Sequence, residues 1–283
     1  MSEVKRIGEI FKTQRVTEGA GVKLRRGFGN VEVPRFDPFL LFDDFSGAEP
    51  TDYMAGFPWH PHRGIETVTY VLHGDVRHRD SMGNEGVIGK GDLQWMSAGS
   101  GIIHEEMPEG VTGMKGFQLW VNLPKDSKMS KPKYQDIKVK TVPEVGLQGG
   151  GRIKVIAGSA AGETGPVKDI VADPLYVDVE LRPSERFAFP VHEGNTTFVY
   201  LIEGELGTGI EGSIIYDKGT ILLYAREGDL VELKAGSSGA RFLLVSGKPL
   251  NEPVAWYGPI VMNSHDELQT AFNELEIGTF IKE

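Results

Sequence analysis

Short runs of apolar and β-branched residues, interrupted by glycine and proline, make up most of the hydrophobic pattern along this chain. Residues 67–72 form one such run, which stops at His73-Gly74, as expected for a strand that ends in a turn. The 37 glycines and 16 prolines favour many turns. The pattern therefore predicts a mostly β protein. Further predicted strands are residues 6–11, 37–45, 117–123, 153–156, 175–181, 186–191, 196–202, 214–216, 220–224, 230–233 and 242–245.

One helix is predicted, near the C-terminus. Ser264 and Glu267 have the spacing of a capping box, in which each side chain bonds the other residue's backbone N–H. Leu268, Phe272 and Leu275 follow at helical spacing and share one face. The pattern therefore predicts a short amphipathic helix that closes the chain.

The length of 283 residues is comfortable for two domains. Between residues 125 and 140 the chain carries six lysines and a central proline, which predicts an exposed connector. We therefore predict an N-terminal domain at residues 1–130, a linker at 131–150 and a C-terminal domain at 151–283.

Charge and composition exclude several classes of partner. The formal net charge of −10 argues against direct nucleic-acid binding and against an anionic membrane as the main partner. The absence of cysteine excludes disulfides and thiolate metal sites. Residues 1–13 lack the apolar core of a signal peptide, and no later run approaches a membrane span. We expect a monomer in the cytoplasm, with the nucleus as an alternative location in a eukaryote.

Two charged stretches have an ordinary interpretation. Residues 19–29 are rich in glycine and arginine, but no helical pattern follows, which excludes a phosphate-binding loop. Cations such as Arg26 are then solvated or paired with acids. Asp43 and Asp44 are adjacent and would face opposite sides of a strand, which favours solvation or a turn over a shared metal site.

Chemistry-bearing residues concentrate around two histidines. His60 and His62 are separated by one residue, so in an extended segment both imidazoles face the same side. Glu66 has the same parity and shares that face while the strand stays regular. His104 and Glu106 form a second pair of equal parity.

Two strands that face each other could surround one ion with these three imidazoles and one carboxylate. Imidazole suits Fe, Ni, Cu or Zn, and a carboxylate adds a hard oxygen ligand. An octahedral ion would keep two positions for water, dioxygen or substrate. Isolated histidines are more often core residues than ligands, and this interpretation is kept for the others: His73, His78, His192 and His265.

The two halves of the chain echo each other. Thr67 and Tyr70 match Thr197 and Tyr200, and the run that begins at Gly91-Asp92-Leu93 matches the run that begins at Gly228-Asp229-Leu230. This pattern predicts two copies of one β unit. Carried across, the four candidate ligands His60, His62, His104 and Glu106 fall on Pro190, His192, Arg241 and Leu243. The second copy is therefore predicted to be structural, without a metal site.

Longer motifs surround the candidate ligands and reach the C-terminus: Gly56-Phe57-Pro58, His60-Pro61-His62-Arg63-Gly64, Gly91-Asp92-Leu93-Gln94-Trp95-Met96, His104-x-Glu106-Met107-Pro108 and Trp256-Tyr257-Gly258-Pro259. Their order and spacing resemble the pirin family of the cupin superfamily. The resemblance implies an all-β bicupin: two tandem cupin-type antiparallel β-barrels with a short C-terminal helix. It also implies one iron, in the N-terminal barrel only, held by His60, His62, His104 and Glu106.

The resemblance implies two alternative functions. One is a dioxygenase that opens the ring of a flavonol such as quercetin with O2, using Fe(II) or another divalent metal such as Mn, Ni, Cu or Zn. The other is a redox-sensitive regulator that docks a protein partner, either a transcription factor or a metabolic enzyme. A sugar or small-acid isomerase is disfavoured, because no arginine or lysine shares the ligand faces.

For the dioxygenase, a Lewis-acid metal would lower the pKa of the substrate hydroxyl, and Glu106 or Glu66 would take the proton. Pirins do not use the glutamate at the position of Glu66 as a ligand, so we expect it to orient an imidazole by accepting its ring N–H. An apolar wall for the substrate is expected from four residues, with core packing as their alternative role: Phe57, Trp59, Trp95 and Met96.

Overall fold

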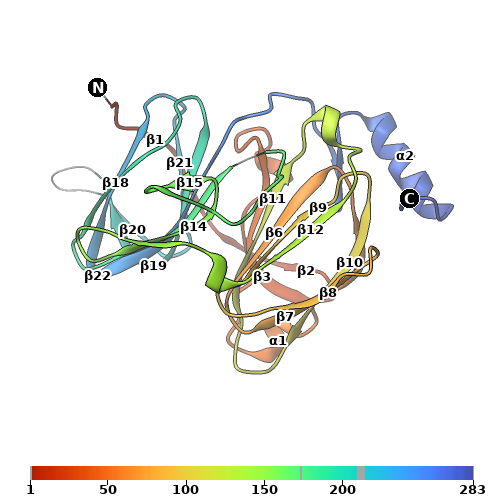
Figure 1. Ribbon diagram of the computed structural model, residues 1–283, viewed down its shortest axis with the longest axis horizontal. Coiled ribbons are helices and arrows are strands. Elements are labelled where there is room, and N and C mark those ends of the chain that lie inside the picture. The colour runs from red at the N-terminus through yellow and green to blue at the C-terminus, as the bar shows by residue number, and fades with distance from the viewer. Residues whose placement is uncertain (1, 173, 209–213, 283) are drawn as a thin grey trace. The chain divides into compact units, whose positions relative to one another are not determined.

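The computed structural model describes residues 2–172, 174–208 and 214–282 (Figure 1). The chain divides into two compact units. The N-terminal unit is formed by the described residues of Gln14–Val139, Ile170–Ala172 and Leu250–Glu283. The C-terminal unit is formed by those of Met1–Thr13, Lys140–Asp169 and Asp173–Pro249.

Both chain ends differ from the predicted domain ranges. The first strand, β1 (Ile7–Lys12), pairs with β21 (Thr220–Tyr224) of the C-terminal unit. The last helix, α2 (His265–Glu276), belongs to the N-terminal unit. The predicted range 1–130 assigns β1 to the N-terminal unit, and the predicted range 151–283 assigns α2 to the C-terminal unit. The structure has both the other way round, because pairing between distant segments leaves no mark in a local sequence pattern.

Two larger antiparallel sheets and the two-stranded sheet β23-β24 build the N-terminal unit. Among the described residues, one sheet runs β12-β9-β6-β11-β4-β3-β2 and the other runs β5-β10-β7-β8. Val22 and Val71 of the first sheet pack in one apolar cluster with Val76 and Ile88 of the second, so the sheets share a core. The strands are β2 (Gln14–Glu18), β3 (Val22–Phe28), β4 (Phe39–Asp44), β5 (Phe57–His62), β6 (Ile65–His73), β7 (Asp75–Asp80), β8 (Glu85–Ile88), β9 (Leu93–Ser97), β10 (Ile102–Glu109), β11 (Lys115–Asn122), β12 (Lys133–Ile137), β23 (Ala255–Tyr257) and β24 (Ile260–Met262).

The helices of this unit are short. The capping box at the start of α2 is confirmed: the Ser264 hydroxyl accepts the Glu267 backbone N–H, and the Glu267 carboxylate accepts the Ser264 N–H. No helix in the described part of the chain is long and apolar enough to cross a membrane. The remaining helices are α1 (Pro50–Tyr53) and the 3-10 turns η1 (Asn30–Glu32), η2 (Lys125–Ser127) and η3 (Val139–Thr141), the last at the boundary between the units in sequence.

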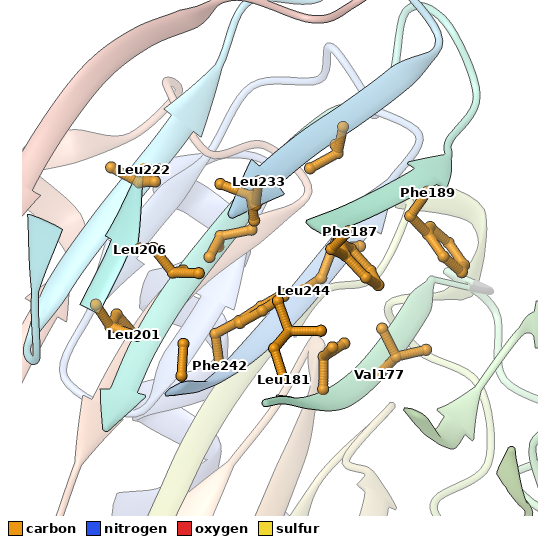
Figure 2. Close-up of a cluster of buried hydrophobic side chains, with 14 of the residues drawn as sticks. Val177, Leu181, Phe187, Phe189, Leu201, Leu206, Leu222, Leu233, Phe242 and Leu244 are labelled. Carbon is orange, nitrogen blue, oxygen red and sulfur yellow. The ribbon is translucent and has the colours of Figure 1, made fainter. Parts of the chain in front are cut away.

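The C-terminal unit repeats the strand order of the larger N-terminal sheet. Its sheet runs β1-β21-β19-β22-β17-β14-β13, with β18 paired to β22 and β20 paired to β19. Its core is one large apolar cluster that includes Phe187, Phe189 and Phe242 (Figure 2). The strands are β13 (Glu144–Gly146), β14 (Arg152–Ala157), β15 (Ser159–Ala160), β16 (Glu163–Thr164), β17 (Leu175–Leu181), β18 (Arg186–Pro190), β19 (Thr196–Gly207), β20 (Ile215–Asp217) and β22 (Leu230–Gly247).

Half of the predicted repeat match is confirmed by this strand order. Thr67 and Thr197 lie on β6 and β19, which hold the same place in their sheets. The match of Gly91-Asp92 to Gly228-Asp229 is wrong: the first precedes β9, which pairs with β6, and the second precedes β22, whose first residues pair with β18. A glycine-aspartate turn can precede any strand, so the shared dipeptide did not identify equivalent strands in the two units.

The lysine-rich segment is exposed at Lys125, Lys131, Lys133 and Lys140, as predicted, but the prediction that it is only a connector is wrong. Strand β12 pairs with β9 within the N-terminal sheet. Lys128 is 2% exposed and donates to the carbonyls of Gly64 and Val261 at 2.8 and 3.0 Å and to the amide oxygen of Asn122 at 2.6 Å. Three converging acceptors can stabilise a buried ammonium. The local sequence pattern could not predict them, because Gly64 and Val261 are distant in sequence from Lys128.

Candidate metal centre

The pairing of β5 with β10 brings three histidines together. His104 lies directly opposite His60, and Ile102 lies opposite His62. One ring nitrogen from each of His60, His62 and His104 lies within 4.8 Å of the other two. The predicted meeting of the two segments is therefore confirmed for the imidazoles, and the cluster can hold a metal ion.

Backbone carbonyls fix the proton positions on two of these rings. His60 Nδ1 lies 2.8 Å from the Pro58 carbonyl oxygen, and His62 Nδ1 lies 3.1 Å from that of Pro259. A carbonyl oxygen only accepts, so both Nδ1 atoms carry the proton and both Nε2 atoms are lone pairs when the rings are neutral. These Nε2 atoms face each other at 3.1 Å.

Two lone pairs at that distance repel unless a cation lies near both. A proton is disfavoured, since burial and then the neighbouring His60 push the pKa of His62 well below its usual value. A metal ion bound by both nitrogens resolves the repulsion. The carbonyls of Pro58 and Pro259 then do what ring-orienting partners do in metal sites, which is to select the metal-binding tautomer.

His104 completes the donor set. It is 0% exposed, and neither of its ring nitrogens has a hydrogen-bond partner in the described part of the chain. Burial, followed by His60, His62 and His78, lowers the pKa of His104 well below its usual value. A buried neutral imidazole with no partner is costly unless it binds a ligand, so this residue fits a metal.

His78 lies close to the cluster but has other partners. Its ring centroid is 5.3 Å from that of His104. Its Nε2 lies 3.2 Å from the Asp80 carboxylate, and its Nδ1 lies 3.1 Å from the Gln94 amide nitrogen. The interpretation of His78 as a core histidine with satisfied ring nitrogens is confirmed.

The carboxylate of Glu106 lies outside the three-histidine cluster. The register of β10 against β5 shifts between His104 and Glu106, which interrupts the regular alternation of faces. Glu106 is 7% exposed, and its Oε1 accepts a hydrogen bond from the Thr69 hydroxyl at 2.7 Å. It lines the same cavity as His60 and His62.

Glu66 does not continue the ligand face, because β5 and β6 are separate strands. Gly64 interrupts them with φ of +76°, and a Cβ there would lie 2.0 Å from the Val261 carbonyl oxygen, so only glycine fits. Glu66 instead accepts from the Ser97 hydroxyl and the Val171 backbone N–H. Burial raises the pKa of this carboxyl. The assumption of one regular strand from His60 to Glu66 is therefore wrong.

A cavity of about 600 Å³ opens beside the histidines. Phe57 and Trp59 line it, as expected for the apolar wall, whereas Trp95 and Met96 are 0% exposed and lie outside its lining. The prediction that Trp95 and Met96 form part of the apolar wall of the substrate site is therefore wrong, because both side chains are buried in the core.

Sequence reasoning missed two aromatic walls. Trp120 packs edge-on against His62 with ring centroids 5.0 Å apart, and Trp256 lies 5.8 Å from Trp120. Both line the cavity. The motif that contains Trp256 was visible, but its contact with a strand more than 100 residues earlier was not.

The comparisons with known proteins agree with this fold. A family model described as Pirin matches residues 21–121, and one described as Pirin C-terminal cupin domain matches residues 176–281. A Pirin-like protein of Caulobacter vibrioides is 43% identical over 281 residues, covering 98% of this chain and 99% of the relative.

Crystal structures that resemble the chain include the following two. The 1.88 Å structure of a quercetin 2,3-dioxygenase from Acinetobacter baumannii is 35% identical, with a TM-score of 0.90 over 98% of this chain and 99% of that one. A bacterial pirin from Escherichia coli in complex with nickel(II) is 20% identical, with a TM-score of 0.64 over 85% and 98% of the two chains. The predicted mostly β fold, with two cupin domains and a short C-terminal helix, is confirmed, while closure into barrels stays a prediction.

Proposed function

Because this chain belongs to the pirin family, we propose that it is a metal-dependent dioxygenase that opens the ring of a flavonol such as quercetin with O2. One observation carries the proposal: two imidazole lone pairs held face to face border a cavity of about 600 Å³. A cavity of this size suits a ligand of three fused or linked rings. The related protein from Acinetobacter baumannii is named a quercetin 2,3-dioxygenase, which supports the same reaction for this chain.

The proposed ligands are His60, His62, His104 and Glu106, with Fe(II) as the ion. Three neutral imidazoles and one carboxylate leave such a site with a charge of about +1, which suits an anionic oxygen of the substrate. The metal would supply Lewis acidity and a binding position for substrate and dioxygen. Nickel, bound by the Escherichia coli pirin, is an alternative, as are Mn, Cu and Zn.

The residues of the cavity have separate tasks in this proposal. Phe57, Trp120 and Trp256 hold the planar substrate and exclude water from it. Glu106 takes the proton of the substrate hydroxyl. It suits this role better than Glu66, because Glu106 lines the cavity whereas Glu66 is bound to Ser97.

Turnover of quercetin by the purified, Fe(II)-loaded protein tests the proposal. Loss of the flavonol absorbance in air is followed for the wild type and for His104→Ala, with metal content measured on the same samples. The wild type should consume quercetin, and the variant should not. Equal rates from both proteins would contradict the proposal. The alternative role as a redox-sensitive regulator with a protein partner stays a prediction.

A further inference from the structure

A row of polar side chains crosses the larger N-terminal sheet and lines the cavity. Thr69 on β6 lies opposite Gln118 on β11, Gln118 lies opposite Asp43 on β4, and Asp43 lies opposite Arg26 on β3. All four side chains line the cavity. The Thr69 hydroxyl donates to the Glu106 carboxylate at 2.7 Å and lies 2.6 Å from the Gln118 side-chain amide, so the row begins at the proposed metal site.

The far end of the row is an ion cluster. Arg26 donates from Nε and Nη2 to the two oxygens of Asp43 at 2.9 and 2.8 Å, and from Nη1 to Glu18 at 2.8 Å. Neighbouring strands lie about 4.8 Å apart, which puts Asp43 roughly 10 Å from Thr69. Asp43 is 5% exposed, so the prediction that it is solvated is wrong.

This cluster offers acceptors rather than positive charge. Two carboxylates surround one guanidinium, so the net charge is about −1 when all three are ionised. Such a group repels carboxylate and phosphate ligands. It attracts neutral hydroxyl donors, because hydrogen bonds to an ionised acceptor are about twice as strong as neutral ones.

The fold does not require these polar residues. The same row of the C-terminal unit consists of Val199, Leu244, Val177 and Val155, joined by the same pattern of strand pairing. All four lie in the apolar core cluster, of which Figure 2 labels Val177 and Leu244. Apolar residues can replace a buried ion pair without loss of stability. The ion cluster of the N-terminal unit therefore serves the cavity.

We propose that Glu18, Asp43 and Arg26 form a binding site for phenolic hydroxyl groups at the end of the cavity remote from the histidines. This inference rests on the proposed function and narrows its substrate class. The favoured flavonols carry hydroxyls on a ring remote from their metal-binding oxygens. Those hydroxyls donate to Glu18 and Asp43, while the planar rings lie between the two ends against Trp120.

Binding without turnover tests the inference. The metal-loaded protein is titrated without oxygen, and the quenching of tryptophan fluorescence gives the Kd of quercetin and of 3-hydroxyflavone, which lacks the other hydroxyls. The wild type should bind quercetin at least about tenfold more tightly, since hydrogen bonds to charged groups contribute this much. Asp43→Asn and Glu18→Ala should reduce that preference, with 3-hydroxyflavone affinity unchanged.

Glu180→Ala is the matched control. Like Glu18, Glu180 is a half-exposed carboxylate paired with an arginine, Arg152, but it lies in the C-terminal unit. It should keep the full preference. Glu18 is exposed enough for its removal to spare the fold, so the test survives even if Asp43→Asn is unstable. Equal affinities of the wild type for both compounds, or a preference unchanged in both variants, would overturn the inference.

The same titration separates this inference from the proposed function. Selective binding of quercetin with no consumption in air would contradict the dioxygenase proposal and support the hydroxyl site. Consumption of both compounds without selectivity would support the dioxygenase and contradict the hydroxyl site. Failure to bind either compound would contradict both.

Discussion

The two units contain sheets of the same strand order with opposite interiors. Across the middle of the N-terminal sheet runs the row Thr69, Gln118, Asp43 and Arg26, which lines a cavity. Across the C-terminal sheet the same row is made of valines and a leucine within a closed apolar cluster (Figure 2).

The strand pair that carries the histidines differs in the same way. In the C-terminal unit, β18 pairs with the first residues of β22, from Arg186 opposite Lys234 to Pro190 opposite Leu230. Of the predicted counterparts of His60 and His104, Pro190 is exposed on β18 and Arg241 donates to the Asp178 carboxylate.

Phenylalanine takes the place of an open interior in the C-terminal unit. The side chains that β18 buries are Phe187 and Phe189, stacked 5.7 Å apart, and Phe187 also packs edge-on against Phe242 at 5.4 Å. Close packing of this kind maximises buried apolar area. One scaffold thus serves two purposes: an interior filled with apolar side chains adds stability, and an interior left hollow and polar provides a site.

The largest difference between the two units should be in metal binding, which a substitution in the N-terminal unit abolishes and one in the C-terminal unit does not. His104→Ala removes a buried ligand and leaves His60 and His62 with the proposed carboxylate ligand Glu106, so bound metal after dialysis should fall from about one ion per chain to the background level. His192→Ala is the control, because that side chain is exposed in the C-terminal unit. Elemental analysis measures both, and equal metal in the two variants would place the site elsewhere.

Truncation of a core side chain in the C-terminal unit should lower folding stability and leave metal binding unchanged. Phe187→Ala removes a large buried ring, so the free energy of unfolding should fall by about 3–5 kcal/mol. Metal content should not change, because no residue of this core belongs to the histidine cluster. Denaturant titration followed by circular dichroism gives the first quantity and elemental analysis the second. A parallel loss of metal would show that the two interiors are coupled.

Buried Lys128 should make a smaller, pH-dependent contribution to the folding stability of the N-terminal unit. Burial lowers the pKa of Lys128 to about 7, so above pH 7 the unfolded chain binds this proton more strongly than the folded one. Folding stability from this group therefore rises with pH between 7 and about 10.

Relative to Lys128→Met, the unfolding free energy of the wild type should increase by up to about 2 kcal/mol between pH 7 and 9. Urea titrations of both proteins at each pH supply the difference. A difference that stays flat or falls with pH would contradict this assignment.

The smallest effect concerns the hydrogen bond that holds Glu106. Thr69→Val removes the hydroxyl that donates to its carboxylate, and the loss of such a partner should weaken metal binding by about tenfold if Glu106 is a ligand. Thr67→Val is the matched control, since the buried Thr67 hydroxyl has no partner among the described residues. Competition with a chelator measures both affinities, and an unchanged value for Thr69→Val would argue against ligation by Glu106.

Local patterns predicted the parts of the fold that depend on neighbours in sequence. The run of apolar and β-branched residues at 67–72 predicted β6, and the spacing of Ser264 and Glu267 predicted the start of α2. The strand period of two predicted that His60 and His62 face one way. It failed at Glu66, because Gly64 has a positive φ and separates β5 from β6, where Val261, distant in sequence, leaves no room for a side chain.

The amino-acid sequence by itself determined strands such as β6 and the shared face of the His60 and His62 imidazoles, because strand periodicity is a property of adjacent residues. Only the tertiary structure decided what surrounds them. The Pro259 carbonyl lies 197 residues from His62, and the ion pair of Arg26 with Asp43 joins the paired strands β3 and β4. Contacts of this kind arise when the chain packs. They determine the tautomers, the cavity and the polar row on which the proposed chemistry depends.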